Sequence, residues 1–277
     1  MKIKFYIKIL FEEKFSPLFL LSVLASRLKI KLPFKVKIAQ GIFLYLHPSS
    51  IAHGLWRKKY SIEIDKLVIE NLVKENFQII DVGANIGHLS LLMAKKAKNG
   101  FVVSIEAARR IFGYFVENIN LNKIFNILPL NLAISNENKI VDFFEFSYAD
   151  DQSALKIDKN WKHQNYKILR IRLDELIKIL SLPRVDFIKI DTEGAELIVI
   201  KSLGEFLSKV KYIYFEFNEE NYRKFGYNGK EILNFLHENG FKILEPKKIN
   251  GSIKFQKFEI QKNYSGNLLA VSKNLSI

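Results

Sequence analysis

The strongest constraint on the fold is the segment Asp81–Ser90, DVGANIGHLS, which joins an apolar run to a helical pattern. The run at 77–82 predicts a buried strand, and residues 86–98 have the apolar spacing of a helix. A chain that leaves a strand and enters a helix within so few residues needs glycine for the tight turn, and Gly83 and Gly87 supply it. A strand–turn–helix unit of this kind is typical of parallel α/β sheets.

Strands and helices alternate along the rest of the chain. Further strands are predicted at 101–106, 127–134, 185–191, 212–217 and 241–245, and helices at 63–74, 108–122, 195 onward and 229–239. We expect 139–147 to form an inserted hairpin arm, and 253–260 and 267–273 to pair as closing antiparallel strands. The pattern predicts a doubly wound, mostly parallel α/β sheet, in which ligands bind outside the carboxyl ends of the strands.

The N-terminal part of the chain has a different pattern. Residues 29–48 alternate between charged and apolar side chains around a Gln-Gly pair, which predicts a β-hairpin. The apolar run Phe15–Ala25 has eleven residues, too few for a helix that spans a bilayer, which needs about 20. Glu12 and Glu13 directly before it argue against a cleaved signal peptide. We expect a helix that packs on the core or lies on a membrane surface.

The net charge of +14 is concentrated in two flanks. Residues 1–59 hold ten Lys and two Arg against two Glu, residues 247–277 hold six Lys against one Glu, and the remainder is close to neutral. We therefore expect a basic N-terminal extension at 1–59, formed by a helix and a hairpin, and a second domain at 60–277. The flanks suit an anionic membrane or an acidic glycan, or they reflect a lysine-rich composition only.

The chain has no cysteine. Structural disulfides, Cys-ligated zinc and thiol catalysis are therefore excluded. The absence of cysteine fits both sides of a membrane and does not determine the compartment. We expect a cytoplasmic protein, with peripheral contact between the basic N-terminal segment and an anionic membrane as an open alternative. The pattern makes no prediction of oligomeric state.

Acidic residues end the first two predicted strands of the sheet. Asp81 is placed to accept hydrogen bonds from an ammonium group, and Glu106 to hold both hydroxyls of a ribose. The free N–H groups at the start of the helix after the glycine turn favour an anionic group such as a carboxylate. The dinucleotide fingerprint G-x-G-x-x-G is not met, because Asn85 and His88 occupy its second and third glycine positions.

A second group of charged residues lies in the segment Phe187–Glu196, FIKIDTEGAE. Lys189 lies within an apolar strand, where a charge is costly unless it is paired. Asp191 and Glu193 follow at the end of that strand, and Glu216 lies within the next apolar strand as the expected partner of Lys189. These acids and those that end the first two strands are expected to converge at one edge of the sheet.

Taken together, these segments resemble the FkbM family of methyltransferases, over about residues 60–273. The family pattern combines a DVGANIG turn, a Glu at the end of the next strand, and a K-I-D-x-E-G-x-E segment, which is Lys189–Glu196 here. The turn is common to many methyltransferases, whereas the KIDTEGAE segment is specific. Two positions depart from the pattern: Ala107 stands where the family often has Pro, and Ser61 where it often has an acidic residue.

The resemblance implies a class I, Rossmann-like sheet of seven strands, S-adenosyl-L-methionine as the cofactor, and O-methyl transfer, often to a sugar hydroxyl. The implied cofactor-binding residues are Asp81, Gly83, Ala84, Asn85 and Gly87 at the methionine part, Glu106 and Ala107 at the ribose, Ala133 and Ile134 beside the adenine, and Asp191.

A sugar hydroxyl is a poor nucleophile, so a positioned base assists its attack on the methyl group. The first candidate for this base is Asp191 and the second is Glu193, with Lys189 and Glu216 as further catalytic candidates. The alternative bases are the histidines at positions 53 and 88. No spacing of His, Asp and Glu requires a metal site.

Two other functions stay open. A methyltransferase that acts on RNA would use the basic flanks to bind phosphates, but the sequence has no N-P-P-Y-type segment after the fourth strand and no recognisable RNA-binding module. A non-catalytic, membrane-peripheral protein with a retained fold would bind no cofactor, whereas both cofactor motifs are intact here. We expect a small-molecule or glycan acceptor rather than a nucleic acid.

Overall fold

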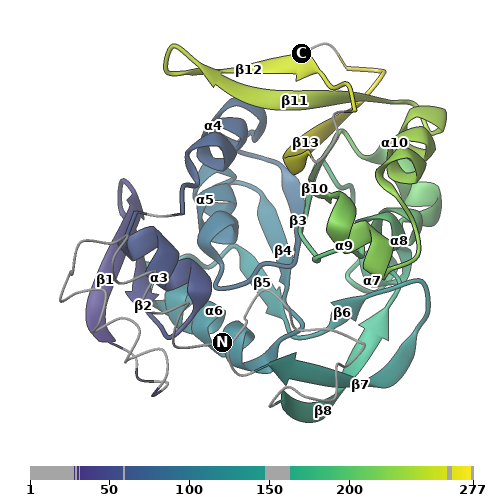
Figure 1. Ribbon diagram of the computed structural model, residues 1–277. Helices are drawn as coiled ribbons and strands as arrows, with labels where there is room; N and C mark the ends of the chain where they lie inside the picture. The colour runs from purple at the N-terminus through teal and green to yellow at the C-terminus, as the bar shows by residue number, and fades with distance from the viewer. Residues whose placement is uncertain are drawn as a thin grey trace, which may run out of the picture. The chain divides into compact units, whose positions relative to one another are not determined.

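The computed structural model describes residues 28, 30, 32–58, 60–146, 163–260 and 264–275 (Figure 1). The chain divides into two compact units, Met1–Ser61 and Ile62–Ile277. The apolar run at 15–25, for which we expected a helix, lies outside the described residues. Among the residues that are described, no helix is both long and apolar enough to cross a lipid bilayer.

The N-terminal unit contains the expected hairpin. Strands β1 (Leu32–Ala39) and β2 (Ile42–Leu46) pair in antiparallel fashion, and Gly41 takes a φ of +68° in the turn between them. Helix α3 (Ser50–Trp56) follows. The side-chain oxygen of Ser49 caps it by accepting a hydrogen bond from the backbone N–H of Ala52 at 3.1 Å. The alternating pattern in the sequence therefore predicted this hairpin correctly.

The second unit is built on one large sheet. Its strands are β3 (Gln78–Val82), β4 (Phe101–Ile105), β5 (Ile127–Leu130), β9 (Phe187–Ile190), β10 (Tyr212–Asn218), β11 (Phe241–Ile249), β12 (Ser252–Lys257) and β13 (Ser265–Ser272). They lie in the order β12-β11-β13-β10-β9-β3-β4-β5.

Strand β3 is the point from which the sheet extends in both directions. The strands β10, β9, β3, β4 and β5 are parallel, and β13 runs antiparallel between β10 and β11. The chain runs from β3 to β4 and β5 on one side and later returns to β9 and β10 on the other side, so the winding direction reverses between β3 and β9. The predicted doubly wound α/β fold is confirmed, and β12 adds an eighth strand to the expected seven.

Helices accompany the strands in the expected alternation (Figure 1). They are α4 (Glu63–Leu72), α5 (His88–Lys96), α6 (Arg109–Asn122), α7 (Leu173–Ile179), α8 (Glu196–Lys201), the 3₁₀ helix η1 (Gly204–Lys209), α9 (Glu219–Lys224) and α10 (Gly229–Glu238). The central strands are apolar along almost their whole length and are buried, as expected for a sheet covered on both faces. Asp81 and Lys189 are the buried exceptions to this apolar pattern on β3 and β9.

The predicted third strand at 127–134 is divided in two. Its second part, β6 (Ala133–Ile134), pairs with β8 (His163–Ile171), which in turn pairs with β7 (Lys139–Phe146) in a separate three-stranded sheet. The break follows from Asn131, whose side-chain amide donates to the carbonyls of residues 106 and 107 at 2.8 and 3.0 Å. These bonds hold the chain at the end of β4, so it leaves the large sheet there. The expected arm at 139–147 is confirmed as β7.

The two closing segments do not pair with each other, contrary to the prediction. Strand β11 lies between β12 and β13 and pairs with both. The reason is the pair Asn250-Gly251, which takes φ angles of 50° and 79° and forms a two-residue turn between β11 and β12. An Asn-Gly pair between alternating strands is a strong hairpin signal, and it makes β12 the hairpin partner of β11.

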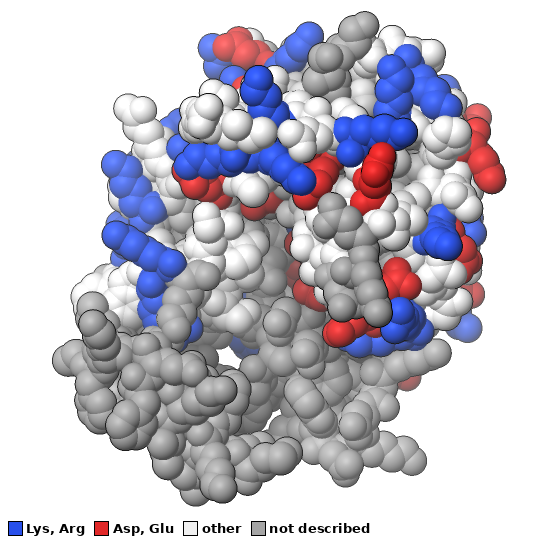
Figure 2. Space-filling view, turned by 45° about the horizontal axis from the view of Figure 1, so that its top comes forward, with Lys and Arg blue, Asp and Glu red and all other residues white. Residues whose placement is uncertain are grey.

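Part of the positive charge of the C-terminal flank is neutralised within the chain. Lys248 contacts Glu63 at 2.6 Å, and Lys247 contacts Glu245 at 2.9 Å. Lys254 and Lys257 on β12 are exposed. Figure 2 shows basic side chains interspersed with acidic ones on the face that includes the β11–β12 hairpin. This flank therefore presents a mixed surface rather than a continuous basic one.

We predict that Gly87→Ala destabilises the protein by about 2–5 kcal/mol. Gly87 has a φ of +81°, and a Cβ at this position would lie 2.0 Å from the ring of Phe115. The alanine therefore adds backbone strain and overlaps with a buried aromatic side chain. Urea denaturation of the purified variant, followed by circular dichroism, measures the change.

Gly113→Ala is the matched control, because Gly113 lies on α6, the same helix as Phe115. A Cβ there meets no atom within 4 Å, and its φ is not in the left-handed region. Alanine is favoured over glycine inside a helix, so we expect this variant to gain about 0.5–1 kcal/mol. Equal unfolding free energies for the two variants would contradict our account of the turn.

Candidate active site

Asp81 lies near the carboxyl end of β3 and has no exposed surface. Ser90 on α5 donates its hydroxyl hydrogen to Oδ2 of Asp81 at 2.5 Å. Burial raises the pKa of Asp81, while the charge of Lys189 acts in the opposite direction. The second oxygen, Oδ1, has no hydrogen-bond partner among the described residues. Asp81 therefore retains one unused acceptor atom beside the glycine turn.

The glycine turn brings the two sequence motifs into contact. Gly83 has a φ of +82°, and a Cβ at this position would lie 1.7 Å from the carbonyl oxygen of Asp191. The backbone N–H groups of Gly83 and Ala84 both donate to the carbonyl of Ile105 at 2.9 Å. Only glycine thus allows the turn to pack against the segment after β9 while it is bonded to the end of β4.

Glu106 follows β4 and is held by the backbone on two sides. Its Oε2 accepts from the N–H of Asn85, and its Oε1 accepts from the N–H of Ala108, both at 2.8 Å. Each carboxylate oxygen has a second lone pair, so Glu106 is able to accept from two more donors, such as ribose hydroxyls. Burial raises the pKa of Glu106 to about 7, although both backbone hydrogen bonds favour the ionised form.

The residues expected beside the adenine lie on two elements. Ala107 follows Glu106, and its carbonyl accepts from the side chain of Asn131. Ala133 and Ile134 lie on β6 of the small sheet and not on a strand of the large sheet. Asn131, two residues before Ala133, links that segment to the residues next to Glu106. The contact of Ala133 and Ile134 with adenine stays a prediction.

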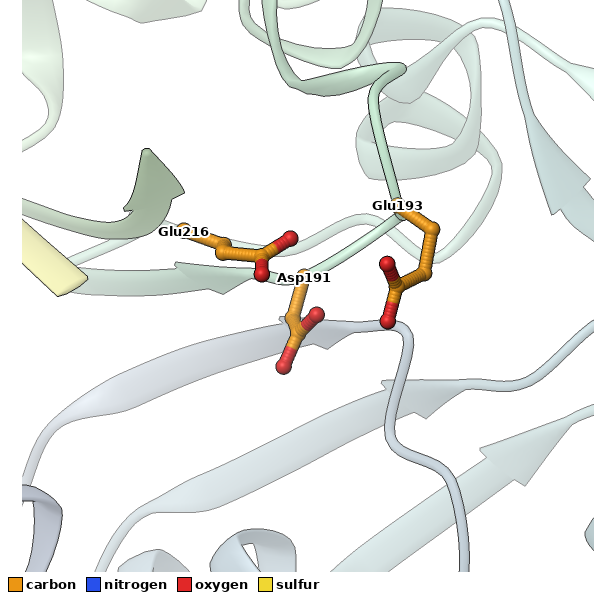
Figure 3. A group of neighbouring side chains, drawn as sticks. All are labelled: Asp191, Glu193 and Glu216. Atoms are coloured by element: carbon orange, nitrogen blue, oxygen red, sulfur yellow. The ribbon is translucent and has the colours of Figure 1, made fainter. Parts of the chain in front are cut away.

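Three carboxylates gather at the ends of β9 and β10. One oxygen from each of Asp191, Glu193 and Glu216 lies within 4.8 Å of the others (Figure 3). Nζ of Lys189 lies 2.9 Å from Oδ2 of Asp191, and only 4% of the Lys189 side chain is exposed. Lys189 thus pairs with Asp191, whereas Glu216 was the partner we expected. The positive charge of Lys189 also lowers the pKa of Glu216, but this effect is smaller than the increase caused by burial.

The three carboxylates are close enough to share a metal ion. The ammonium group of Lys189, however, already supplies a positive charge to Asp191 at hydrogen-bond distance. A site for a divalent cation is usually built from oxygen ligands alone. The arrangement is therefore an acidic face with its own buried counter-ion.

Glu216 is a member of this group whose pKa is strongly raised. It is half-buried, and burial raises its pKa to about 7, with the negative charges of Asp191 and Glu196 contributing to the increase. Its Oε2 has no hydrogen-bond partner among the described residues. A group with such a pKa is able to exchange a proton at physiological pH.

Glu193 occupies an unusual backbone conformation that its neighbours stabilise. It has a φ of 54°, and Gly194 after it has a φ of 116°, where a Cβ would lie 2.6 Å from the carbonyl of Asn221. The side chain of Asn221 donates to Oε2 of Glu193 at 2.8 Å. The N–H and hydroxyl of Thr192 donate to Oε1 of Glu196 at 2.7 and 2.9 Å. The KIDTEGAE segment is thus a tightly bonded loop.

The two histidines are weak candidates for a base. His88 lies at the start of α5 and is buried, and burial lowers its pKa to about 3, with the charge of Lys189 adding to the decrease. His53 belongs to the N-terminal unit, and burial lowers its pKa to about 4. Groups with such low pKa values have little affinity for a proton near neutral pH, whereas the raised pKa of Glu216 gives that residue a higher affinity.

The sequence analysis missed a third charged group beside the site. Glu145 on β7 and Tyr166 on β8 are hydrogen-bonded to each other at 3.0 Å, and Arg110 at the start of α6 contacts Glu145 at 3.2 Å. Glu145 lies between two Phe residues in the strand at 139–147, which is the same signal that identified Glu216 and was available in the sequence. These residues contact the backbone that follows Glu106.

We predict that Lys189→Met lowers the free energy of unfolding by about 3–5 kcal/mol at pH 8, because it removes the buried counter-ion of Asp191. The pKa values of Asp81 and Glu216, which Lys189 holds down, rise in this variant. These carboxyls then take up protons more readily on folding, so the loss is smaller at pH 5.5 than at pH 8. Urea denaturation at both pH values measures the difference.

Lys167→Met is the matched control for this variant. Lys167 pairs with Asp142 at 2.8 Å, but both side chains are exposed. Exposed pairs contribute little to stability, so we expect a change below about 1 kcal/mol at either pH. A Lys189→Met loss of the same size, or one that is independent of pH, would contradict the role of Lys189.

Comparison with known proteins identifies several relatives. Methyltransferase 1 of Beauveria bassiana is 22% identical over 189 residues, which cover 62% of this chain and 76% of that protein. Hexuronic acid methyltransferase AglP of Haloferax volcanii is 25% identical over 176 residues, which cover 64% and 67%. The 2-O-methyltransferase NoeI of Sinorhizobium fredii is 22% identical over 200 residues, which cover 66% and 81%.

A sequence profile described as the methyltransferase FkbM domain matches residues 81–243, more than half of the chain. The match begins at Asp81 and includes the glycine turn, Glu106 and the whole KIDTEGAE segment. These are the segments whose contacts form the acidic edge of the sheet. The chain therefore belongs to the FkbM family of S-adenosylmethionine-dependent methyltransferases.

Proposed function

We propose that this protein transfers a methyl group from S-adenosylmethionine to a hydroxyl of a sugar, a glycan or a related small molecule. The observation that carries the proposal is the set of unused acceptors at one edge of the sheet. Asp81 and Glu216 lie on either side of the Lys189–Asp191 ion pair. Each of the two has a buried carboxylate oxygen without a hydrogen-bond partner among the described residues. Two relatives are named as a hexuronic acid methyltransferase and a 2-O-methyltransferase, which supports a sugar acceptor.

The residues present fit the polar groups of the proposed cofactor. Oδ1 of Asp81 is suited to accept from the ammonium group, and the remaining lone pairs of Glu106 from the ribose hydroxyls. The backbone N–H groups at the start of α5 favour the carboxylate of the methionine part. Ala107 and the β6 segment would flank the adenine. When bound, the cofactor supplies an activated methyl group on its sulfonium centre.

The acidic cluster is the proposed acceptor side of the site. Asp191 would take the proton from the acceptor hydroxyl, with its carboxylate oriented by the ion pair to Lys189. Glu193, held by Asn221, is the second candidate for this role. Glu216 adjoins Asp191, and its pKa of about 7 allows it to share the proton near neutral pH. The negative charge of the cluster also favours a cationic methyl donor over its neutral product.

Glu106→Gln is expected to weaken S-adenosylmethionine binding at pH 8 by about tenfold, because the amide nitrogen replaces one charged acceptor. In the wild type, affinity should fall as pH drops below about 7, where Glu106 becomes protonated. This pH dependence should be weaker in the variant. Isothermal titration calorimetry between pH 5.5 and 9 measures both effects.

Glu238→Gln serves as the control, since Glu238 is exposed on α10 and lies outside the proposed site. It should bind S-adenosylmethionine as the wild type does at every pH. Failure of the wild type to bind the compound at all would contradict the proposed function, and it would favour a non-catalytic role for the fold.

Asp191→Asn is expected to lose methyl transfer by about 10²–10⁴-fold, which is a larger loss than the weakening of cofactor binding that removal of this charge also causes. Release of S-adenosylhomocysteine is measured with a panel of hexuronic acids, hexoses, oligosaccharides and RNA. Glu193→Gln is the companion variant, with a smaller expected loss. Full activity of Asp191→Asn would show that another group is the base, and transfer to RNA alone would overturn the proposed acceptor class.

A further inference from the structure

The inserted arm of β7 and β8 makes a buried polar contact with the start of α6. Only 3% of the Glu145 side chain is exposed, although it lies on a two-stranded arm. Its Oε1 contacts Nε of Arg110 at 3.2 Å, and its Oε2 accepts from the hydroxyl of Tyr166 at 3.0 Å. The backbone N–H of Arg110 also donates to Oε2 at 3.3 Å. A buried carboxylate with several donors fixes the geometry of the groups around it.

Tyr166 extends this contact to the residues that follow Glu106. Its hydroxyl oxygen accepts from the backbone N–H of Arg109 at 2.6 Å and lies 3.3 Å from the carbonyl oxygen of Ala107. The guanidinium of Arg109 lies over the Tyr166 ring at 4.3 Å from its centroid. One side chain of the arm therefore contacts two consecutive peptide groups next to Glu106.

The same turn is held from its other side by Glu106 itself. The N–H of Ala108 donates to Glu106 at 2.8 Å, and the N–H of the next residue, Arg109, donates to Tyr166. The turn is therefore bonded both to the carboxylate of Glu106 and to the arm. The arm also acts through charge, since Glu145 raises the pKa of Glu106, whereas Lys189 on β9 lowers it. Arg109 and Arg110 on α6 are the other charged groups next to this turn.

We propose that Glu145 and Tyr166 are positioning residues for the ribose of the methyl donor: they hold the turn after β4 so that Glu106 presents its free lone pairs. This inference rests on the proposed assignment of Glu106 to the ribose. It makes the arm part of cofactor recognition, although neither arm residue needs to touch the cofactor.

A merely structural arm would give a different result. If Glu145 and Tyr166 only attached the arm, their loss would lower the melting temperature and leave cofactor affinity and its pH profile unchanged. If they position Glu106, removal of the Tyr166 hydroxyl weakens binding, and removal of the Glu145 charge moves the pH at which binding is half lost. The two readouts are independent of any loss of stability.

The test compares S-adenosylmethionine binding by calorimetry between pH 5.5 and 9 for the wild type, Tyr166→Phe and Glu145→Gln. Tyr166→Phe should weaken binding at pH 8 by about five- to tenfold, with little change in the pH midpoint. In Glu145→Gln the pH midpoint should move to lower pH, because a carboxylate that raised the pKa of Glu106 is gone.

Asp142→Asn is the matched control on the same arm. Asp142 also pairs with a basic residue, Lys167 at 2.8 Å, but both side chains are exposed. This variant should match the wild type in affinity and pH profile. Thermal unfolding of all four proteins establishes whether each variant is folded at the temperature of the titration.

The outcomes separate this inference from the proposed function. If the wild type binds and Glu106→Gln binds more weakly, while Tyr166→Phe and Glu145→Gln match Asp142→Asn in affinity and pH midpoint, the arm inference is overturned and the role of Glu106 stands. Lower melting temperatures without a change in binding overturn it in the same way. If the wild type does not bind S-adenosylmethionine, both proposals fail.

Discussion

The acidic edge of the sheet depends on one buried cation. Lys189 lies on a central strand with almost no exposed surface, and it pairs directly with Asp191. Its charge also lowers the pKa values of Asp81, Glu106 and Glu216, each of which burial alone would raise. Buried carboxylates at the ends of neighbouring strands repel one another, so a cation inside the sheet is what allows them to remain close together. The charge within the apolar strand is thus a structural requirement of the site.

The backbone imposes a second requirement on the same place. Gly83 packs against the carbonyl of Asp191 so closely that no other side chain fits, and the turn is bonded to Ile105 at the end of β4. Three neighbouring strand ends are therefore joined by main-chain contacts. The main chain that carries Asp81, Glu106 and Asp191 is held in place by these contacts.

Sequence patterns predicted the strands, the glycine turn and the acids at strand ends, because apolar periodicity and glycine requirements are local properties. Contacts between distant segments were harder to predict. Lys189 was expected to pair with Glu216 on the next strand and pairs with Asp191 instead. The division of the third strand depends on hydrogen bonds from Asn131 to residues 25 and 24 positions away, which no periodicity reveals. The β11–β12 hairpin had a local signal, the Asn-Gly pair, and was predictable.

The lysines of the C-terminal flank lie partly on an open edge of the large sheet, where they have a role other than binding an anionic partner. Strand β12 is the last strand of the sheet, and its outer backbone groups have no neighbouring strand in the described part of the chain. Such an edge is a template for pairing with another molecule, and natural proteins discourage this aggregation by placing lysines along it. Lys254 and Lys257 are exposed on this strand. Lysines on an edge strand oppose edge-to-edge association, and this role requires no anionic partner.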